Sequence, residues 1–297
     1  MERSFARFLG VDLGGGRGKK TAVARLERVG EDNLEVVEVG TADGAGRAYH
    51  DGALLDALTT HAADAALAID APLTLPACIR CREPVCPTVA ACVDPAVVWL
   101  RDVGAPLVAA AAAAERDQIA AVPSGRASST GTQAVSRSAT RPLVTPYTQR
   151  ATEVVLHRLH GIVPRETLGQ SSGPLTARAA HLVRVLAGRG FELGRNLIEV
   201  DPKATITKLW GPRAARRYRR EAGTWETRAA ILESLRGQVE FARTSRLARE
   251  DCLRSDHCFD AVIAAYTAFL WARDGWTLPE LHRQVFVEDG WIFAPGL

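Results

Sequence analysis

The sequence predicts an α/β protein in which a mixed sheet is flanked by helices. Its 297 residues are 47% apolar and 24% charged, which is the balance of a soluble globular chain and excludes a disordered, collagen-like or coiled-coil protein. Residues 8–70 alternate between apolar and polar with the short period of strands, interrupted by one helical stretch. Residues 211–272 carry instead the longer period of helices.

The N-terminal elements follow a clear order. Apolar runs with strand periodicity predict three strands, at residues 8–13, 21–26 and 34–39. A helix is expected over 50–65, and a short buried strand over 67–70 is stopped by Ala-Pro. Three strands, a helix and a fourth strand predict a sheet that is antiparallel at first and parallel after the crossover.

The rest of the chain is expected to be mostly helical. Residues 123–142 are rich in Ser, Thr, Gly and Arg, which is typical of a flexible loop. Helices are expected over 146–160, 175–187, 211–220, 224–237 and 258–272, with a strand over 196–200. We therefore predict a single domain over 1–297, with its core at 7–73 and 194–275, an insertion at 74–193 and a C-terminal hairpin at 283–297.

The charged start of the chain lacks the apolar run of a signal peptide. The longest apolar window, near 103–114, is too short to cross a membrane and predicts a buried helix. We expect a cytoplasmic protein that does not contact a membrane and keeps its cysteines reduced.

Acidic residues occur at strand ends and on the last long helix. In a parallel sheet the carboxyl ends of strands meet at one edge, so we expect these side chains to converge. Gathered carboxylates repel one another unless cations lie among them, and Mg²⁺ or Mn²⁺ would satisfy that charge. Taken singly, each acid is better explained as a turn residue, and it is the joint order of the acids that favours a site. The candidates are Asp12, Asp70, Glu199 with its neighbour Asp201, and the pair Asp256 and Asp260 on one helix face.

Four short motifs carry these acids in a recognisable order. They are Gly10-Val-Asp12, Ala68-Ile-Asp70-Ala-Pro72, Ile198-Glu199-Val-Asp-Pro202 and Asp256-His-Cys-Phe-Asp260-Ala261. This order resembles the domain of unknown function 429 family, described as predicted nucleases of the ribonuclease H fold. The final Asp-Ala pair is also similar to the end motif of Holliday-junction resolvases.

The resemblance implies a ribonuclease H-like core with a helical, cysteine-bearing insertion. It further implies that Asp12 and Asp260 bridge two Mg²⁺ or Mn²⁺ ions, with Asp70 and either Glu199 or Asp256 completing the site. We therefore expect a metal-dependent nuclease that hydrolyses phosphodiester bonds of DNA or RNA. A non-catalytic nucleic-acid-binding protein with the same fold is an alternative.

A glycine-rich hairpin, Gly-Gly-Gly-Arg-Gly-Lys-Lys, is expected at residues 14–20. It does not fit a P-loop, because the first glycine of that motif would fall on Leu13 and its hydroxyl residue on Lys20. Sugar kinases and actin-like ATPases use a similar hairpin, so an ATP-dependent phosphotransferase is another alternative, beside a solvated hairpin without ligand. The amides of the hairpin could bind phosphate together with Arg17, Lys19 and Lys20.

Four cysteines have the spacing C-x2-C-x4-C-x5-C, at Cys78, Cys81, Cys86 and Cys92. In a reducing compartment such a cluster indicates metal binding more than disulfides. The single CxxC pair is compatible with zinc, and Cys86-Pro87 is typical of the end of a ferredoxin run, so Zn²⁺, a 4Fe–4S cluster and no metal all stay open. Cys252 and Cys258 are expected to be buried small apolar residues.

The net charge of +3 says little, but one arginine cluster is local. A helical face with interleaved aromatic residues could neutralise phosphates and stack on bases, or simply be a solvated face. That face is made of Arg213, Arg216, Arg217 and Arg220. Among the histidines, His257 lies beside the last acids and could orient water or shuttle a proton, or lie at the surface.

Overall fold

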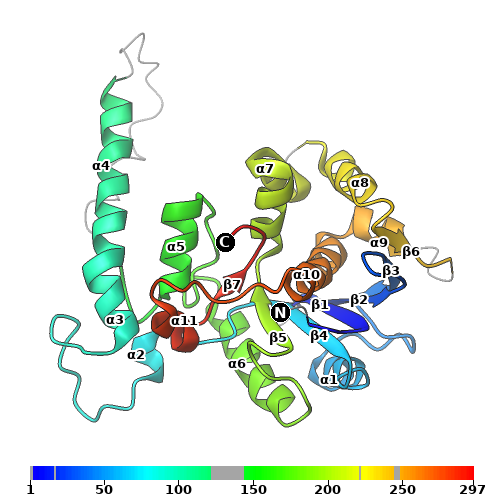
Figure 1. The fold of residues 1–297 in the computed structure, drawn as a ribbon, viewed down its shortest axis with the longest axis horizontal. Coiled ribbons are helices and arrows are strands. Elements are labelled where there is room, and N and C mark those ends of the chain that lie inside the picture. The colour runs from blue at the N-terminus through cyan, green and yellow to red at the C-terminus, as the bar shows by residue number, and fades with distance from the viewer. Residues whose placement is uncertain (1–2, 17, 122–143, 221, 244–247) are drawn as a thin grey trace.

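The structure, a computed structural model, describes residues 3–16, 18–121, 144–220, 222–243 and 248–297. Within them the chain forms one seven-stranded sheet of order β6-β3-β2-β1-β4-β5-β7, with helices on both faces (Figure 1). Arg17 and the predicted loop at 123–142 lie outside the described residues, as do the side chains of 115–121 and Arg220.

The sheet is mixed, as predicted. Strands β1 and β2 are antiparallel, as are β2 and β3, whereas β4 is parallel to β1 and is followed outward by parallel β5 and β7. This is the switch expected after the crossover, and it is consistent with a ribonuclease H-like fold. The strands are β1 (Arg7–Asp12), β2 (Ala22–Arg28), β3 (Leu34–Gly40), β4 (Ala65–Asp70), β5 (Leu197–Val200), β6 (Val239–Phe241) and β7 (Ile292–Phe293).

The helices surround the sheet and extend beyond its β7 edge. Those expected over 50–65, 146–160, 175–187, 211–220, 224–237 and 258–272 are all present. The helices are α1 (Asp51–Thr59), α2 (Ala77–Arg80), α3 (Pro95–Trp99), the π-helical turn η1 (Leu100–Gly104), α4 (Ala105–Ala121), α5 (Ala151–His160), α6 (Gly173–Ala187), α7 (Pro202–Arg220), α8 (Thr224–Ser234), α9 (Ala248–Arg254), α10 (Asp256–Arg273) and α11 (Arg283–Asp289).

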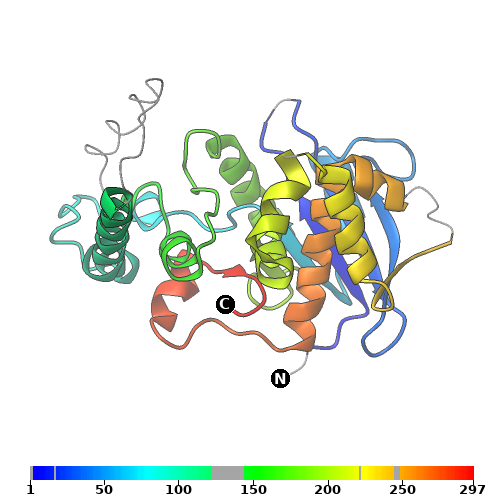
Figure 2. The same ribbon diagram turned by 90° about the horizontal axis from the view of Figure 1, so that it is seen from above.

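Each face of the sheet buries its own apolar cluster, because successive strand residues point to opposite faces. On one face Phe8 and Ile198 pack under α10, which lies along β1, β2 and β4 (Figure 2). On the other face Val11 and Ile69 pack against Leu182 of α6 and against α1. Helix α6 therefore belongs to the core, although its residues fall in the segment predicted as an insertion.

Helix α10 lies close enough to β1 for backbone to meet backbone. A Cβ atom at Gly10 would lie 2.0 Å from the carbonyl oxygen of Ala261 and 2.4 Å from the amide nitrogen of Ala265. Only glycine is compatible with that approach. The first and last of the acidic motifs are thus packed against each other.

The predicted C-terminal hairpin at 283–297 is wrong. Residues 283–289 form α11, because Phe286 packs on Trp99 and Trp291 and thereby buries one side of a helix. Gly290, with φ of 85°, ends the helix, and β7 then joins the sheet beside β5 instead of pairing with the preceding segment. Strands β6 and β7 were too short to show a period in the sequence.

The apolar stretch near 103–114 is helical, but the prediction that it is buried is wrong. Helix α4 stands at the end of the molecule farthest from the sheet (Figure 1), and Ala109 and Ala110 are exposed. Within the described residues, one helical stretch, Pro95–Ala114, is long and apolar enough to cross a membrane by length and composition alone. Soluble proteins contain helices that pass the same test.

Candidate functional site

Asp12 and Asp70 lie side by side at the carboxyl ends of β1 and β4. The two residues are direct partners in the parallel register, so their side chains point to the same face, the one covered by α10. Both side chains are almost fully buried, with 5% of Asp12 and 9% of Asp70 exposed. Two adjacent buried carboxylates are costly unless positive charge compensates them.

Asp260 reaches the same place from α10. Its side chain is fully buried and accepts hydrogen bonds from the guanidinium of Arg219, with Nε at 2.9 Å from Oδ2. Its other oxygen, Oδ1, has no hydrogen-bond partner among the described residues. A buried carboxylate oxygen without a partner needs an explanation, and it can accept a contact from an ion or ligand.

Arg219 is the cation that links these acids. It extends from α7, and beyond its bond to Asp260 its Nη2 lies 3.8 Å from Oδ2 of Asp70. Burial lowers the pKa of its guanidinium, but the charges around it, Asp260 first, raise that pKa above its usual value. Arg219 therefore stays charged and stands where the sequence led us to expect a metal ion.

His257 compensates the remaining acid. Its Nδ1 lies 2.5 Å from Oδ2 of Asp12. This hydrogen bond raises the pKa of the imidazole, although partial burial opposes the shift. The imidazole is thus biased towards its charged form and can hold a proton beside Asp12.

The carboxyl groups themselves have perturbed pKa values. Burial raises the pKa of Asp260 to about 7, with Arg219 opposing the shift and Asp12 adding to it. Burial, together with the charge of Asp12, raises the pKa of Asp70 well above its usual range. Functional sites often hold acids with shifted pKa values, because ligand binding and catalysis depend on the protonation state of such groups.

The described arrangement does not form a finished metal centre. Among the described residues, no group of three or more His, Cys, Asp or Glu side chains is placed to hold a metal ion. Arg219 accounts for this at the acidic site, since its guanidinium lies against both Asp70 and Asp260. Asp256 is half-buried in the first turn of α10, where its charge acts on His257 and Asp260.

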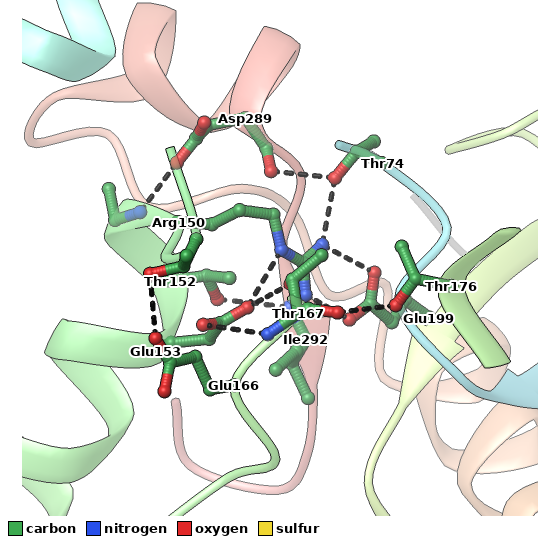
Figure 3. Close-up of polar contacts among 12 residues, drawn as sticks. Thr74, Arg150, Thr152, Glu153, Glu166, Thr167, Thr176, Glu199, Asp289 and Ile292 are labelled. Carbon is green, nitrogen blue, oxygen red and sulfur yellow. Dashed lines mark hydrogen bonds and ion pairs between the residues drawn. The ribbon is translucent and has the colours of Figure 1, made fainter. Parts of the chain in front are cut away.

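Glu199 lies elsewhere, contrary to the expectation that it completes the site. In the register it pairs with Ile69, the residue before Asp70, so its side chain points to the opposite face of the sheet. There it receives hydrogen bonds from Arg150 at 2.6 and 2.8 Å and from the amide of Leu73 at 2.8 Å (Figure 3). The motif 198–202 identifies the strand end correctly but not the direction of the side chain.

Arg150 is the centre of a closed polar network (Figure 3). Its side chain is fully buried and also donates to Glu153 at 3.0 Å and to Thr74 at 2.8 Å. Asp289 accepts from the amide of Ala151 at 2.5 Å. Burial lowers the pKa of Arg150, but the charges of Glu199 and Glu153 outweigh it and raise that pKa. We define the Arg150 network as Arg150 with its partners Thr74, Glu153 and Glu199, and Asp289. Each nitrogen of the Arg150 guanidinium has an acceptor within it.

The glycine-rich hairpin borders a separate cleft of about 480 Å³. Lys19 and Lys20 are exposed at its rim, whereas Arg178 is held by hydrogen bonds to the hairpin and to Asp51. The two ends of the hairpin are joined by a hydrogen bond from the amide of Gly14 to Oγ1 of Thr21. The hairpin thus presents two lysines to a concave surface.

The cysteines fall into a buried pair and a cluster of four. Cys252 and Cys258 are buried, which confirms their prediction as small apolar residues. All six cysteines are free thiols. Burial raises the pKa of Cys78, and the neighbouring cysteines add to the shift. The four clustered cysteines line one cleft beside α2 and α3. Cys78 and Cys92 are half-buried there, and Cys81 and Cys86 are exposed.

The predicted arginine face splits into different environments. Arg213 is exposed, and Arg217 donates a hydrogen bond to the carbonyl of Ala222 at 3.3 Å. Arg216 lines a cleft that also contains Arg219 and Asp70. The prediction omits Arg219, because its contact with Asp260 depends on how α7 packs on α10, which no local pattern reveals.

Comparison with known proteins gives one match. A family model described as "Protein of unknown function (DUF429)" matches residues 10–282. No curated protein and no solved structure matches the chain. The matched range includes Asp12, Asp70 and Asp260, and it leaves β7 outside.

Proposed function

The chain belongs to the DUF429 family of proteins of unknown function, and we propose that it is a metal-dependent nuclease that hydrolyses phosphodiester bonds of DNA or RNA. One observation carries the proposal. Asp12, Asp70 and Asp260, from two strands and a late helix, meet as buried acids at the carboxyl edge of the sheet. Ligands of open α/β sheets bind at that edge.

The donor set suits hard divalent cations. Carboxylate oxygens are the ligands that Mg²⁺ and Mn²⁺ prefer, and Oδ1 of Asp260 is left without a partner in the described residues. Two such ions, held by Asp12, Asp70 and Asp260 with Asp256 nearby, would supply an activated water and stabilise the leaving oxygen. Binding of the ions requires Arg219 to release part of its contact with Asp70 and Asp260.

The surrounding residues have complementary roles in this proposal. Arg219, once a cation has taken over the acids, would neutralise a phosphate beside Asp70, since a guanidinium matches phosphate oxygens in charge and geometry. His257 would hold a proton at its Nδ1, beside Oδ2 of Asp12. Glu199, bound to Arg150 on the other face, has no part in the reaction.

Cleavage assays test the proposal directly. Single-stranded, duplex and branched DNA and RNA are incubated with Mg²⁺ or Mn²⁺ and with the wild type, D12N or D260N. We expect both variants to lose about a hundredfold or more in rate, the size typical of removing a group that stabilises transition-state charge. Asp56→Asn, which changes an exposed carboxylate on α1, is the matched control. Undiminished cleavage by D260N would remove Asp260 from the reaction. Salt-sensitive binding without cleavage under either metal would favour the non-catalytic alternative.

The cleft at the hairpin supports a second candidate, a phosphotransferase that binds ATP through residues 14–20. Lys19, Lys20 and the hairpin amides line a concavity of about 480 Å³, within the range of small-molecule sites. Calorimetric titration with ATP and Mg²⁺ distinguishes the two functions. Micromolar binding that Lys20→Gln weakens, in a protein that cuts no nucleic acid, would favour the phosphotransferase.

A metal at the four cysteines is a separate proposal. The described arrangement does not bring three of them together for a metal. Binding of Zn²⁺ or a 4Fe–4S cluster therefore requires the exposed segment with Cys81 and Cys86 to close onto Cys78 and Cys92. Metal analysis and the absorption spectrum of anaerobically purified protein test this, because an iron–sulfur cluster is coloured and zinc is not. Protein free of both metals would end the proposal.

A further inference from the structure

A second group of basic side chains lies beyond the acidic site, on the far side of Asp70. Helix α7 and the loop that follows α5 enclose a cleft of about 400 Å³ there. Asp70 and Asp201 form part of its wall. Its basic residues are Arg165 from the loop and Lys203, Arg216 and Arg219 from α7.

Three of these cations have no partner in the described part of the chain. Arg219 is bonded to Asp260, whereas the side chains of Arg165, Lys203 and Arg216 form no hydrogen bond or ion pair there. Some other arginines of the described residues are paired, as Arg178 is with Asp51 and Arg150 with Glu199. Exposed ones such as Arg184 and Arg213 are not, so what distinguishes the cleft is that its unpaired cations lie together. Unpaired cations that converge on one concave surface attract an anion.

The cleft brings acids and cations together. Asp70 and Asp201 lie on its wall with Arg165 and Arg216, both of which are exposed. Arg165 and Asp70 thus line the same concave surface. A strand with several phosphates can bind the exposed arginines through one phosphate and extend towards the acids with the next.

We propose that Arg165, Lys203 and Arg216 form a phosphate subsite, which holds the phosphate next to the reacting one on a nucleic-acid strand. The proposal rests on the nuclease function proposed above. Arginine binds phosphate through two donors, and lysine adds a point charge. The subsite contacts the backbone of the strand, so it fixes the register of the substrate without reading its sequence.

Metal-free binding measurements test the subsite apart from catalysis. Fluorescein-labelled single-stranded DNA and RNA oligonucleotides are titrated in EDTA at several salt concentrations, and anisotropy is recorded for the wild type and for R165Q/R216Q. We expect the double variant to bind about tenfold more weakly and its salt slope to fall by about one, since one phosphate contact is lost. Arg195→Gln, an exposed arginine before β5, is the matched control and leaves both values unchanged.

Cleavage kinetics separate this proposal from the nuclease proposal. In an active enzyme R165Q/R216Q raises KM about tenfold and leaves kcat within about twofold, because the lost contact binds ground state and transition state alike. Weakened binding by the double variant, in a protein that cuts no substrate, would retain the subsite and remove the nuclease. Equal affinity and equal salt slope in wild type and double variant, or no binding by the wild type, would overturn the subsite.

Discussion

Two sets of buried acids and arginines flank the end of β4, and they hold their charge in different ways. In the Arg150 network the guanidinium is matched by Glu199, Glu153 and Thr74. At the acidic site Arg219 is shared between Asp260 and Asp70, and an oxygen of Asp260 has no partner among the described residues. The first arrangement is that of a structural element. The second, with an oxygen left without a partner, is consistent with the binding site that we propose.

The comparison teaches that burial and residue type alone do not separate the two roles. Glu199 and Asp70 are similarly buried and both follow from strand-end motifs. The two sets differ in whether the chain itself supplies a hydrogen-bond partner for every charged atom. Replacing a member of each set should therefore change stability and activity in opposite ways.

The largest expected effect is on stability, in Arg150→Met. Removing the guanidinium leaves Glu199 and Glu153 buried without a counter-ion, which costs about 3–5 kcal/mol of unfolding free energy. Urea denaturation at neutral pH measures the change. Arg236→Met, whose partner Glu233 is exposed, is the control and should change the free energy by less than about 1 kcal/mol. An unchanged unfolding midpoint combined with lost cleavage would return Glu199 to the functional site.

Replacing a carboxylate with an amide should change the free energy of unfolding in opposite directions in the two sets. Glu199→Gln loses charge-assisted hydrogen bonds and should destabilise the fold by about 1.5–3 kcal/mol. Asp70→Asn removes a carboxylate whose burial opposes ionisation and should stabilise it by about 1 kcal/mol near pH 8. Thermal unfolding of both variants at that pH decides the matter. Destabilisation by Asp70→Asn would mean that its charge is already compensated.

The acidic site should also make stability depend on pH and metal. Burial raises the pKa of Asp260 to about 7, so the folded state binds more protons than the unfolded state from about pH 4 to about pH 7, and stability falls as pH rises through that range. Mn²⁺ at about a hundredfold its Kd should restore about 2.7 kcal/mol near pH 8. Melting curves with Mn²⁺ or EDTA measure both effects. The Mn²⁺ effect should vanish in Asp260→Asn, and its persistence there would place the metal elsewhere.

The smallest effect is expected for His257→Gln. The pKa of His257 is raised by Asp12, so the pair stabilises the fold below the unfolded pKa and loses this contribution as pH rises through the folded pKa. Because the imidazole is 39% exposed, the contribution should stay below about 1 kcal/mol. Denaturation near pH 5 and pH 9 compares the two regimes. A loss of equal size at both would show that the contact is packing and not charge.

The sheet and the meeting of three acids could be predicted because they depend on local signals. Asp12 and Asp70 end apolar strands, and Asp260 lies near the start of a long apolar helix whose residues 258–272 are all buried. The face of the sheet to which a side chain points could not be predicted in the same way. For Glu199 it depends on the register between β4 and β5. A shift of one residue would have turned that side chain towards Asp70.

The arginines that neutralise these acids could not be predicted from the sequence, for a different reason. Arg150 lies far from Glu199 along the chain, as Arg219 does from Asp260, and nothing local distinguishes the two from the other arginines. The prediction of a C-terminal hairpin failed because the apolar residues of that segment pack against α3, which a local pattern does not reveal. Long-range packing decided each of these cases.

The contact between Gly10 and α10 has a consequence for redesign of the protein. Since carbonyl and amide atoms of the helix touch the bare α-carbon of the strand, the separation of Asp12 from Asp260 is fixed by main chain and not by side-chain packing. The side chains at those two positions can therefore be exchanged, for example to histidine or cysteine, on a scaffold whose spacing does not change. Gly10 itself is the one position along that contact that admits no replacement.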